Sequence, residues 1–292
     1  MIGKKFKKIG IICHDAGSAN IIINWIKYYK KKYIIRADGP AKKIFKRILK
    51  NKKINHKLEK IIQNSDLIIT GTSNISSLEN RARMIALQKK KKVIAVLDHW
   101  VFFKERFIYK KKILLPNEIW VTNKFAYALV KKKIKNVNVK LKKNILEKLI
   151  ARVKATKVKK IRNYLYFLEP INNSVEFIAL KKFHLFLKKN NINNNISIIF
   201  KLHPREKINK YKKILNIFNK YNYKIIGDKN LLQLFSWAQI ILGLRSYALV
   251  LGIKTRKPLY SLLPIKNFKT TLPYKIKNLF NINKKELLYL QK

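Results

Sequence analysis

The sequence predicts a two-domain α/β protein in which each domain is a Rossmann-like, doubly wound parallel sheet and the two domains face a cleft. Short apolar, β-rich runs alternate with longer amphipathic stretches along the chain. The alternation pauses over residues 145–162 and then restarts, which predicts domains at residues 1–155 and 156–292. The length of 292 residues suits two cores of roughly 150 residues each.

The first half alternates strands and helices regularly. Strands are predicted at Ile9–Cys13, Tyr33–Arg36, Leu67–Thr70, Val93–Leu97, Ile119–Thr122 and, with the weakest pattern, Val137–Leu141. Helices are predicted between them at 18–31, 41–63, 76–89 and 124–134. Ser18 is placed to cap the first of these helices, and Ser76 with Glu79 has the spacing of a capping box. This alternation favours a parallel sheet with helices on both faces.

The second half repeats the pattern after a basic stretch at 145–162, which is predicted to be helical. Its strands are predicted at Tyr164–Leu168, Ile196–Lys201, Lys224–Ile226, Ile240–Leu242 and Leu259–Leu262. Its helices are predicted at 174–190, 205–220, 230–238 and 246–254, with an Asn-rich loop at 191–195. The tail at 265–292 is predicted to pack back as helix, although its pattern is weak.

The net charge of the chain is +54, from 68 basic and 14 acidic residues. A field of this sign attracts nucleic acid, anionic lipid head groups and phosphorylated substrates. The lysine runs at 89–92, 110–112 and 131–133 are dispersed, as they are on solvated faces. The abundance of Lys, Ile, Asn and Tyr with only 8 Gly is typical of A/T-rich coding sequence, which accounts for part of the charge.

Several protein classes are disfavoured by the composition. Apolar runs such as 21–23 and 240–242 are far shorter than the roughly 18 residues of a membrane span. The basic N-terminus leads into only a short apolar run, unlike a secretory signal peptide. Cys13 is the single cysteine, which excludes an internal disulfide and a cysteine-based metal site. We therefore expect a cytoplasmic protein without a metal site.

Acidic and histidine side chains gather directly after predicted strands. In doubly wound sheets, ligands bind beyond the carboxyl ends of the strands. Since the chain has only 14 acids and 5 histidines, this concentration predicts a functional edge on each sheet. The residues in question are Asp15, Asp38, Asp98, Glu169, Asp228, His14, His99 and His203.

The loop His14–Asn20 follows the first strand and opens the first helix, where backbone N–H groups and the helix dipole accept an anion. It has one glycine rather than the G-x-G-x-x-G fingerprint, so a dinucleotide cofactor is disfavoured. His14 or Asp15 is a candidate acid/base group. A helix cap with a tight turn is the structural alternative.

Two further loops of the first half are candidates. Gly71, Thr72 and Ser73 form a small, hydroxyl-rich loop that could hold a phosphate or a sugar, and a simple cap and turn explains it equally well. Asp98 and His99 follow the fourth strand, beside Trp100. They suit a cleft wall because such side chains are costly to bury without partners.

The second half carries the sharper motifs. Lys201-Leu202-His203-Pro204-Arg205 follows a strand, and its proline is expected to end that strand and to start a helix at Arg205. A histidine between cations stays neutral or donates to an anion, so His203 is a candidate phosphate-binding residue. The segment Gly243-Leu244-Arg245-Ser246-Tyr247 again joins a strand to a helix and is expected to present free N–H groups to an anion.

In their order and spacing, these last two motifs resemble the donor-binding half of GT-B-fold glycosyltransferases. Bacterial sialyltransferases and the capsule-polysaccharide and teichoic-acid transferases are similar, and the resemblance covers roughly residues 160–264. It implies that His203, with Lys201 and Arg205, contacts the phosphate of a nucleotide. It implies that Ser246 and the backbone from Gly243 to Tyr247, including Arg245, hold a phosphate or the sugar, and that Glu169 lies near the nucleotide.

The resemblance also implies the chemistry. A nucleotide-sugar is the donor substrate, a glycan or lipid-linked acceptor is the second substrate, and neither a metal nor another cofactor is needed. Cations and a helix N-terminus stabilise the departing phosphate. The catalytic base comes from the first half, with Asp15 as first candidate and Asp98 or His99 as second. The basic surface would dock on the inner face of an anionic membrane or on an acidic polysaccharide.

Three alternatives remain open. A non-hydrolysing nucleotide-sugar epimerase has the same two-half architecture and needs no acceptor. A catalytically inactive relative is the second, because a D/E-D/E-G motif and an acid after Gly243 are both absent. A basic nucleic-acid-binding protein is the third, although the sequence has no RNP-like motif and no zinc finger.

Overall fold

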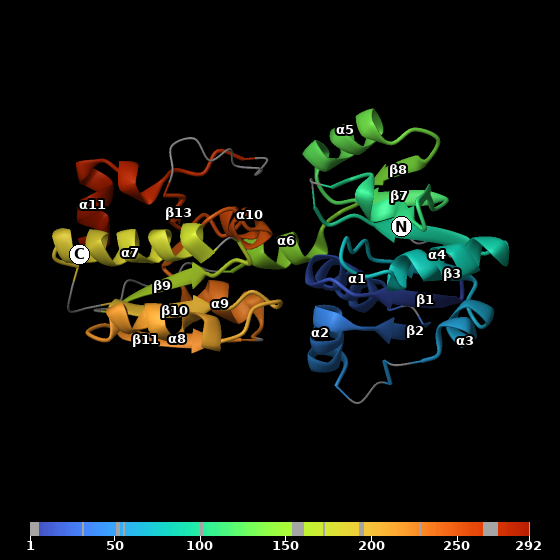
Figure 1. Ribbon diagram of the computed structural model, residues 1–292, viewed down its shortest axis with the longest axis horizontal. Helices are drawn as coiled ribbons and strands as arrows, with labels where there is room; N and C mark the ends of the chain where they lie inside the picture. The colour runs from blue at the N-terminus through green and yellow to red at the C-terminus, as the bar shows by residue number, and fades with distance from the viewer. Residues whose placement is uncertain are drawn as a thin grey trace. The chain divides into compact units, whose positions relative to one another are not determined.

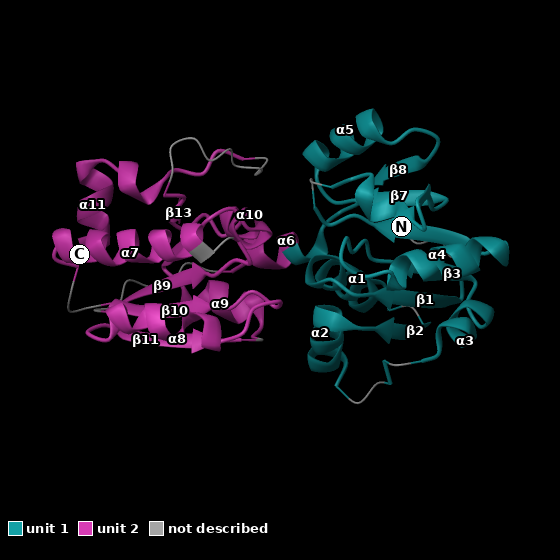
Figure 2. Cartoon of the chain, in the orientation of Figure 1, with its two compact units in different colours: residues 1–146 teal, residues 147–292 magenta. Residues whose placement is uncertain are grey.

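The computed structural model describes residues 6–30, 32–50, 53–54, 56–99, 102–153, 161–171, 173–192, 196–227, 229–264 and 274–291. The chain forms two compact units, Met1–Leu146 and Glu147–Lys292 (Figure 2). The division lies upstream of the predicted join at 155, within helix α6 (Ile145–Ala151). No helix among the described residues is both long and apolar enough to cross a membrane.

The first unit is built on a six-stranded parallel sheet. In chain order its strands are β1 (Lys8–Cys13), β2 (Lys32–Ala37), β3 (Leu67–Thr70), β4 (Lys92–Val96), β7 (Glu118–Val121) and β8 (Asn138–Leu141). They lie in the order β2-β1-β3-β4-β7-β8, and each neighbouring pair is parallel. The order reverses between β1 and β3, which is where doubly wound sheets bind their ligands.

Helices cover both faces of this sheet (Figure 1). On one face, α3 (Leu58–Gln63) and α4 (Leu78–Gln88) bury Ile61 and Ala82 against Ile12 and Ile68. On the other face, α1 (Ala16–Tyr29) places Trp25 edge-on to Trp120 of β7, with ring centroids 5.5 Å apart. The unit also contains α2 (Gly39–Leu49), α5 (Lys124–Lys133), a 3₁₀ turn η1 (Glu105–Phe107) and the two-stranded hairpin β5 (Ile108–Tyr109) and β6 (Lys112–Ile113).

The second unit is built on a five-stranded parallel sheet in the order β11-β10-β9-β12-β13. Its strands are β9 (Arg162–Phe167), β10 (Ile196–Lys201), β11 (Asn222–Ile226), β12 (Ile240–Gly243) and β13 (Leu259–Ser261). The order reverses between β9 and β12. The loops that follow these two strands therefore meet at the switch point of the sheet.

Side-chain alternation along β9 separates the two layers of helices in this unit. Tyr166 points to the layer of α7 (Asn173–Lys189), where Phe183 lies 5.9 Å from it between ring centroids. Phe167 points to the opposite layer and packs on Phe235 of α9 (Leu231–Trp237) at 5.7 Å. The other elements are α8 (Asn209–Leu215), η2 (Asn216–Phe218), α10 (Tyr247–Ile253), η3 (Leu279–Asn281) and α11 (Lys284–Gln291).

The predicted doubly wound pattern is confirmed in both units, but several elements differ from the prediction. The helix predicted at 41–63 is two helices, α2 and α3, because Ile54 between them is buried and accepts the Ala37 N–H beside β2. The helix predicted at 145–162 ends at Ala151, and residues 154–160 lie outside the described part of the chain. The tail contains η3 and α11, whereas residues 265–273 are not described.

Both predicted N-caps were wrong. Helix α1 begins at Ala16 with Asp15 at its N-cap, and Ser18 is buried inside the first turn. Helix α4 begins at Leu78, and Glu79 is not part of a capping box, because its carboxylate accepts a hydrogen bond from another strand-end loop.

The helix predicted at 205–220 begins only at Asn209. Pro204 and Arg205 lie in a turn, where the Arg205 N–H donates to His203 instead of starting a helix.

Candidate functional site

The carboxyl edge of the first sheet brings His14 and Asp15 together. His14 Nδ1 lies 2.8 Å from Asp15 Oδ1, and the same oxygen accepts the Ser73 hydroxyl at 3.1 Å. The side chain of His14 is 18% exposed and that of Asp15 is 10% exposed, so the pair is largely buried at the end of the strand. A Cβ on Gly39, which has a φ of +50°, would lie 2.5 Å from His14 Nε2. Gly39 therefore leaves room for the imidazole of His14 against the backbone.

Asp98 lies against the N-terminus of α1. A Cβ on Gly17 would be only 1.8 Å from Asp98 Oδ2, so glycine is required for this close approach. Burial raises the pKa of Asp98, while the Arg106 guanidinium, 3.7 Å from Oδ1, and a hydrogen bond from the Ser18 backbone oppose this rise. The protein's own carboxylate thus occupies the place at this helix where an anion was expected.

A network of buried polar side chains holds the His14–Asp15 pair in place. Glu79 Oε1 accepts the His14 N–H at 2.7 Å, which holds the loop after β1 in place. Arg83, fully buried, donates to Thr70 Oγ1 at 3.1 Å, to Asn80 Oδ1 and to the Arg106 carbonyl at 2.9 Å. Glu79, Asn80 and Arg83 belong to α4, Thr70 ends β3 and Arg106 lies in η1, so the network joins the ends of β1 and β3 to η1.

The loop of Gly71, Thr72 and Ser73 was expected to hold a phosphate or a sugar, but its polar groups are engaged within the protein. Gly71 donates its N–H to Ile12, and Thr72 Oγ1 donates to the Val96 carbonyl at 3.0 Å. Ser73 donates to Asp15 and accepts two backbone N–H groups. All three residues are buried. The loop positions Asp15 rather than offering donors to a ligand.

His99 follows Asp98 and is partly exposed, whereas Trp100 and Val101 lie outside the described residues. Asp38 forms an ion pair with Arg36 at 3.1 Å. Asp228 also lies outside the described part of the chain.

Glu79 makes the stability of the first unit depend on pH. Burial raises the pKa of Glu79 from 4.5 to about 7, against the hydrogen bond from His14 and the charge of Arg83. The folded state therefore retains a proton that the unfolded state has lost. We expect the free energy of unfolding to fall as the pH rises through this window, by about 1.4 kcal/mol for each unit of pKa shift.

Denaturant unfolding between about pH 5 and 8 measures this effect. Glu79→Gln keeps an acceptor for the His14 N–H but cannot titrate, so its stability is expected to vary less with pH than that of the wild type. Glu59→Gln, at an exposed position on α3, is the matched control and should retain the wild-type pH dependence. An identical pH profile in Glu79→Gln and the wild type would contradict the prediction.

The carboxyl edge of the second sheet differs from its prediction at Glu169. One oxygen of this buried carboxylate, Oε1, accepts the backbone N–H groups of Leu244, Arg245 and Ser246 at 3.0, 2.8 and 2.7 Å. The turn from Gly243 to Tyr247 was expected to present free N–H groups. That expectation was wrong, because Glu169 takes them across the switch point between β9 and β12.

A second carboxyl group lies behind Glu169. Glu176 of α7 is buried, and its Oε2 accepts the Glu169 N–H at 3.1 Å. Burial, followed by the charge of Glu169, raises the pKa of Glu176 to about 8. Burial likewise raises the pKa of Glu169, against its three backbone hydrogen bonds. Glu176 is therefore neutral near pH 7, which reduces the repulsion between the two carboxyl groups.

His203 is held neutral in a single tautomer at the end of β10. Burial and the charges of Arg205, Lys201 and Lys210 lower its pKa to about 3. Its Nδ1 accepts the Arg205 N–H at 3.2 Å, so the proton of the neutral ring is on Nε2. Among the described residues no group accepts from Nε2, which is accessible at the strand end. This nitrogen can donate to an anion.

The cations near His203 have different roles. Lys201 is buried and donates to the Leu202 carbonyl at 2.6 Å, whereas Arg205 is exposed. Lys210 forms an ion pair with Glu206 at 2.8 Å. Arg205 is thus the cation that a ligand can reach directly, and the other two act on His203 through their charge.

Sequence reasoning missed the supporting residues Glu79, Arg83, Arg106 and Glu176. Each lies on a predicted helix or in an unassigned segment, where an acid or arginine is normally solvated. No spacing rule marks them as buried. Since the chain has only 14 acids, Glu79 and Glu176 in the first turns of two helices were the available signal.

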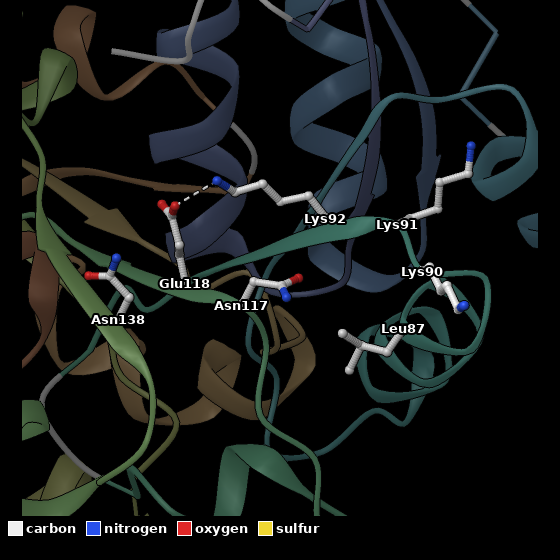
Figure 3. Close-up of a pocket in the computed structure, with 7 residues that line it drawn as sticks. All are labelled: Leu87, Lys90, Lys91, Lys92, Asn117, Glu118 and Asn138. Atoms are coloured by element: carbon white, nitrogen blue, oxygen red, sulfur yellow. Dashed lines mark ion pairs between the residues drawn. The ribbon is translucent and has the colours of Figure 1, made fainter.

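A pocket of about 530 Å³ lies at the opposite edge of the first sheet, lined by Leu87, Lys90, Lys91, Lys92, Asn117, Glu118 and Asn138 (Figure 3). Its one carboxylate, Glu118, pairs with Lys92 at 2.8 Å and with Lys140 at 2.9 Å. Burial opposes ionisation, but hydrogen bonds from Lys92, Trp120 and Lys140 hold the pKa of Glu118 at about 2. This pocket lies at the amino ends of the strands, away from the candidate groups.

No family model and no curated protein matches the sequence. Solved structures do match the fold. MnaA of S. aureus in its UDP co-structure aligns with a TM-score of 0.67 at 12% identity, over 98% of this chain and 90% of that chain. The UDP-GlcNAc 2-epimerase of Methanocaldococcus jannaschii, in complex with UDP-GlcNAc and UDP, aligns with a TM-score of 0.59 at 17% identity, over 87% and 83%. Trehalose-6-phosphate synthase OtsA aligns with a TM-score of 0.52 at 8% identity, over 87% and 84%.

At these identities the similarity concerns the fold. It extends over most of each compared chain and over both sheets of this one. The chain therefore has a GT-B-like fold of two Rossmann-like domains, which confirms the fold class implied by the resemblance of residues 160–264.

Proposed function

We propose that this protein is a glycosyltransferase-like enzyme that transfers a sugar from a nucleotide-sugar to a surface-glycan or lipid-linked acceptor. Two facts support a nucleotide-sugar ligand. The fold is shared with proteins whose structures contain UDP or UDP-GlcNAc. The second unit has a neutral histidine with a free N–H donor at the edge of the sheet where such ligands bind in doubly wound folds.

The observation that carries the proposal is the state of His203. Its Nε2–H donates to a diphosphate oxygen, and its low pKa keeps the ring neutral throughout the physiological range. Arg205, exposed beside it, supplies positive charge. These groups stabilise the charge that develops on the diphosphate as its bond to the anomeric carbon breaks. Neither a metal nor a further cofactor is part of this proposal.

The base in this proposal is Asp15 with His14. The acceptor hydroxyl attacks the anomeric carbon, the bond to the diphosphate oxygen breaks, and the hydroxyl proton passes to the His14–Asp15 pair. The 2.8 Å contact orients the imidazole, and Ser73 and Glu79 fix the two residues from behind. Asp98, which is buried against Gly17, is the second candidate for the base.

An epimerase that inverts the sugar without an acceptor is the second candidate. The specific observation in its favour is the similarity to UDP-GlcNAc 2-epimerases with TM-scores of 0.59 and 0.56, each over 87% of this chain. Such an enzyme uses the same donor-binding half. The two candidates differ in whether an acceptor is consumed.

Thermal-shift measurements with UDP, CMP, GDP, CDP and ADP, and with a short RNA as polyanion control, test the proposal. We expect one nucleotide to stabilise the protein selectively, and His203→Ala to reduce its affinity by about tenfold or more, since a hydrogen bond to a charged group contributes about 1.5–3 kcal/mol. His56→Ala, in the first unit, is the control and should bind as the wild type does. Equal stabilisation by every polyanion, or unchanged binding in His203→Ala, would refute the proposal.

Product analysis with the selected nucleotide-sugar separates the two candidates. A transferase releases the nucleotide in proportion to the acceptor glycosylated. An epimerase converts the sugar in the absence of an acceptor, and that result would replace the transferase assignment.

A further inference from the structure

A small hairpin projects from the first unit and takes no part in the candidate site. It consists of β5 and β6 joined by the two-residue turn Lys110-Lys111, and we call residues 108–113 the docking hairpin. Its sequence is Ile-Tyr-Lys-Lys-Lys-Ile. Ile108 and Ile113 are 44% and 62% exposed, and the three lysines between them are also exposed. Transfer of these two side chains from water to an apolar phase would be favourable.

The turn of the docking hairpin is strained. Lys110 has a φ of +48° and Lys111 a φ of +63°, as both central residues of a type I′ turn require. Asn-Gly is the preferred sequence for such a turn, because residues with longer side chains pay a steric cost in the left-handed region. Lysine also adopts a positive φ at Lys30, Lys50 and Lys90, so the backbone angles alone do not explain why lysines form this turn.

The two faces of the hairpin have different chemistry. Ile108 and Ile113 are directly opposite each other across the antiparallel pair, so their side chains lie on one face. Tyr109 and Lys112 form the second pair and lie on the other face. Lys110 Nζ lies 5.9 Å from the centroid of the Tyr109 ring. An apolar pair, a tyrosine and three lysines are thus gathered within six residues.

The base of the hairpin is rigidly anchored. Phe107 is buried directly before β5, with the Arg83 guanidinium 5.0 Å above its ring. Asn80 of α4 donates to the Ile108 carbonyl at 3.3 Å, and the Leu114 N–H donates to Phe107 at 2.7 Å. The hairpin therefore presents its tip in a fixed position, which lowers the entropic cost of docking.

We propose that the docking hairpin binds the surface of an anionic lipid bilayer, with Ile108 and Ile113 entering the boundary of the acyl region and the lysines contacting the head groups. Charge complementarity supports this occupant, because Lys110 and Lys111 form the exposed tip of the hairpin, the exposed Lys112 directly follows them, and the chain has a net charge of +54. Tyrosine and lysine are enriched at membrane interfaces, where aliphatic side chains can leave water. A nucleic acid would neutralise the lysines but would offer the isoleucine pair no apolar phase. The proposal is independent of the nucleotide-sugar assignment.

Co-sedimentation of the full chain with vesicles tests the proposal. The anionic vesicles contain phosphatidylcholine and phosphatidylglycerol, and the neutral vesicles contain phosphatidylcholine alone. The wild type is expected to bind only the anionic vesicles. Ile108→Ser/Ile113→Ser leaves the charge unchanged and is expected to weaken binding about tenfold, because the buried apolar area is lost. Lys110→Asn/Lys111→Gly is expected to weaken it by more than about tenfold, because each lysine near an anionic surface contributes a factor of about five.

The lysine variant also separates docking from folding. Asn-Gly relieves the strained turn, so the variant is expected to be as stable as the wild type or more stable while it binds vesicles less well. Lys212→Gln/Lys213→Gln removes the same charge at two exposed positions on α8 and is the matched control, which should retain binding.

Three outcomes would overturn the proposal. The serine variant could bind anionic vesicles as the wild type does, which would show that the overall positive charge alone accounts for binding. The α8 control could lose as much binding as the hairpin variant, which would show that position does not matter. Finally, poly(U) binding could depend on Lys110 and Lys111 while vesicle binding does not, which would point to nucleic acid instead.

Discussion

Asp15→Asn is expected to lower turnover of the nucleotide-sugar by about 10²–10⁴-fold, the usual contribution of a positioned general base. The asparagine keeps the shape of the side chain and an acceptor for the Ser73 hydroxyl, which lies 3.1 Å from Asp15 Oδ1. It removes the negative charge that orients the His14 imidazole. Nucleotide affinity is expected to remain unchanged, because the proposed donor site lies in the second unit. Steady-state kinetics, with thermal shift for nucleotide binding, measure the two effects.

Asp38→Asn is the matched control for this change. Asp38 also directly follows a strand, but its carboxylate pairs with Arg36 at 3.1 Å. Its turnover should equal that of the wild type. If Asp15→Asn retained full turnover, the base would move to Asp98 or His99. If it lost nucleotide binding, Asp15 would be a binding residue rather than a base.

Glu169→Ala is expected to destabilise the second unit by about 3 kcal/mol. It would leave the buried N–H of Leu244 and the partly buried N–H groups of Arg245 and Ser246 without their acceptor; an unsatisfied buried N–H costs about 1–3 kcal/mol, and a partly buried one costs less. Burying the carboxylate itself costs free energy, so its removal offsets part of this loss. We therefore expect a total near the lower end of the summed cost of the three N–H groups. Chemical denaturation of the full chain measures the loss.

Glu169→Gln places an amide oxygen where Oε1 lies and is expected to lose only about 1 kcal/mol. Glu206→Ala removes the partly exposed ion pair with Lys210 and should cost less than about 1 kcal/mol. Equal stability of Glu169→Ala and Glu206→Ala would show that the three hydrogen bonds of Glu169 do not organise the switch-point turn.

The strands were predictable because parallel strands buried on both faces give compact apolar runs, such as Ile9–Cys13 and Ile240–Leu242. Helix boundaries were less predictable because tertiary contacts determine them. Ile54 hydrogen-bonds beside β2 and interrupts a helical pattern, and the imidazole of His203 takes the N–H that would begin a helix at Arg205. The docking hairpin was missed because its turn is Lys-Lys rather than a recognisable turn sequence.

The location of polar groups at strand ends was also predictable, since Asp15, Asp98, Glu169 and His203 all follow strands in the structure. The hydrogen-bond partners of these groups were not predictable from the sequence. Glu169 and Ser246 are far apart in the sequence, and only the strand order, with β9 next to β12, brings them within 2.7 Å. The sequence indicated an anion site at this turn, and the structure places a carboxylate of the protein there.

The proposed state of His203 is tested most directly by imidazole ¹H–¹⁵N NMR, recorded with and without the nucleotide that the thermal-shift panel selects. His203→Gln identifies the signal. We predict a neutral ring with its proton on Nε2, no protonation between about pH 5 and 8, and a shift of the Nε2–H signal when the nucleotide binds. A ring that titrates near the ordinary value of 6.5, or an Nε2–H signal that the selected nucleotide does not shift, would contradict the proposed role of His203.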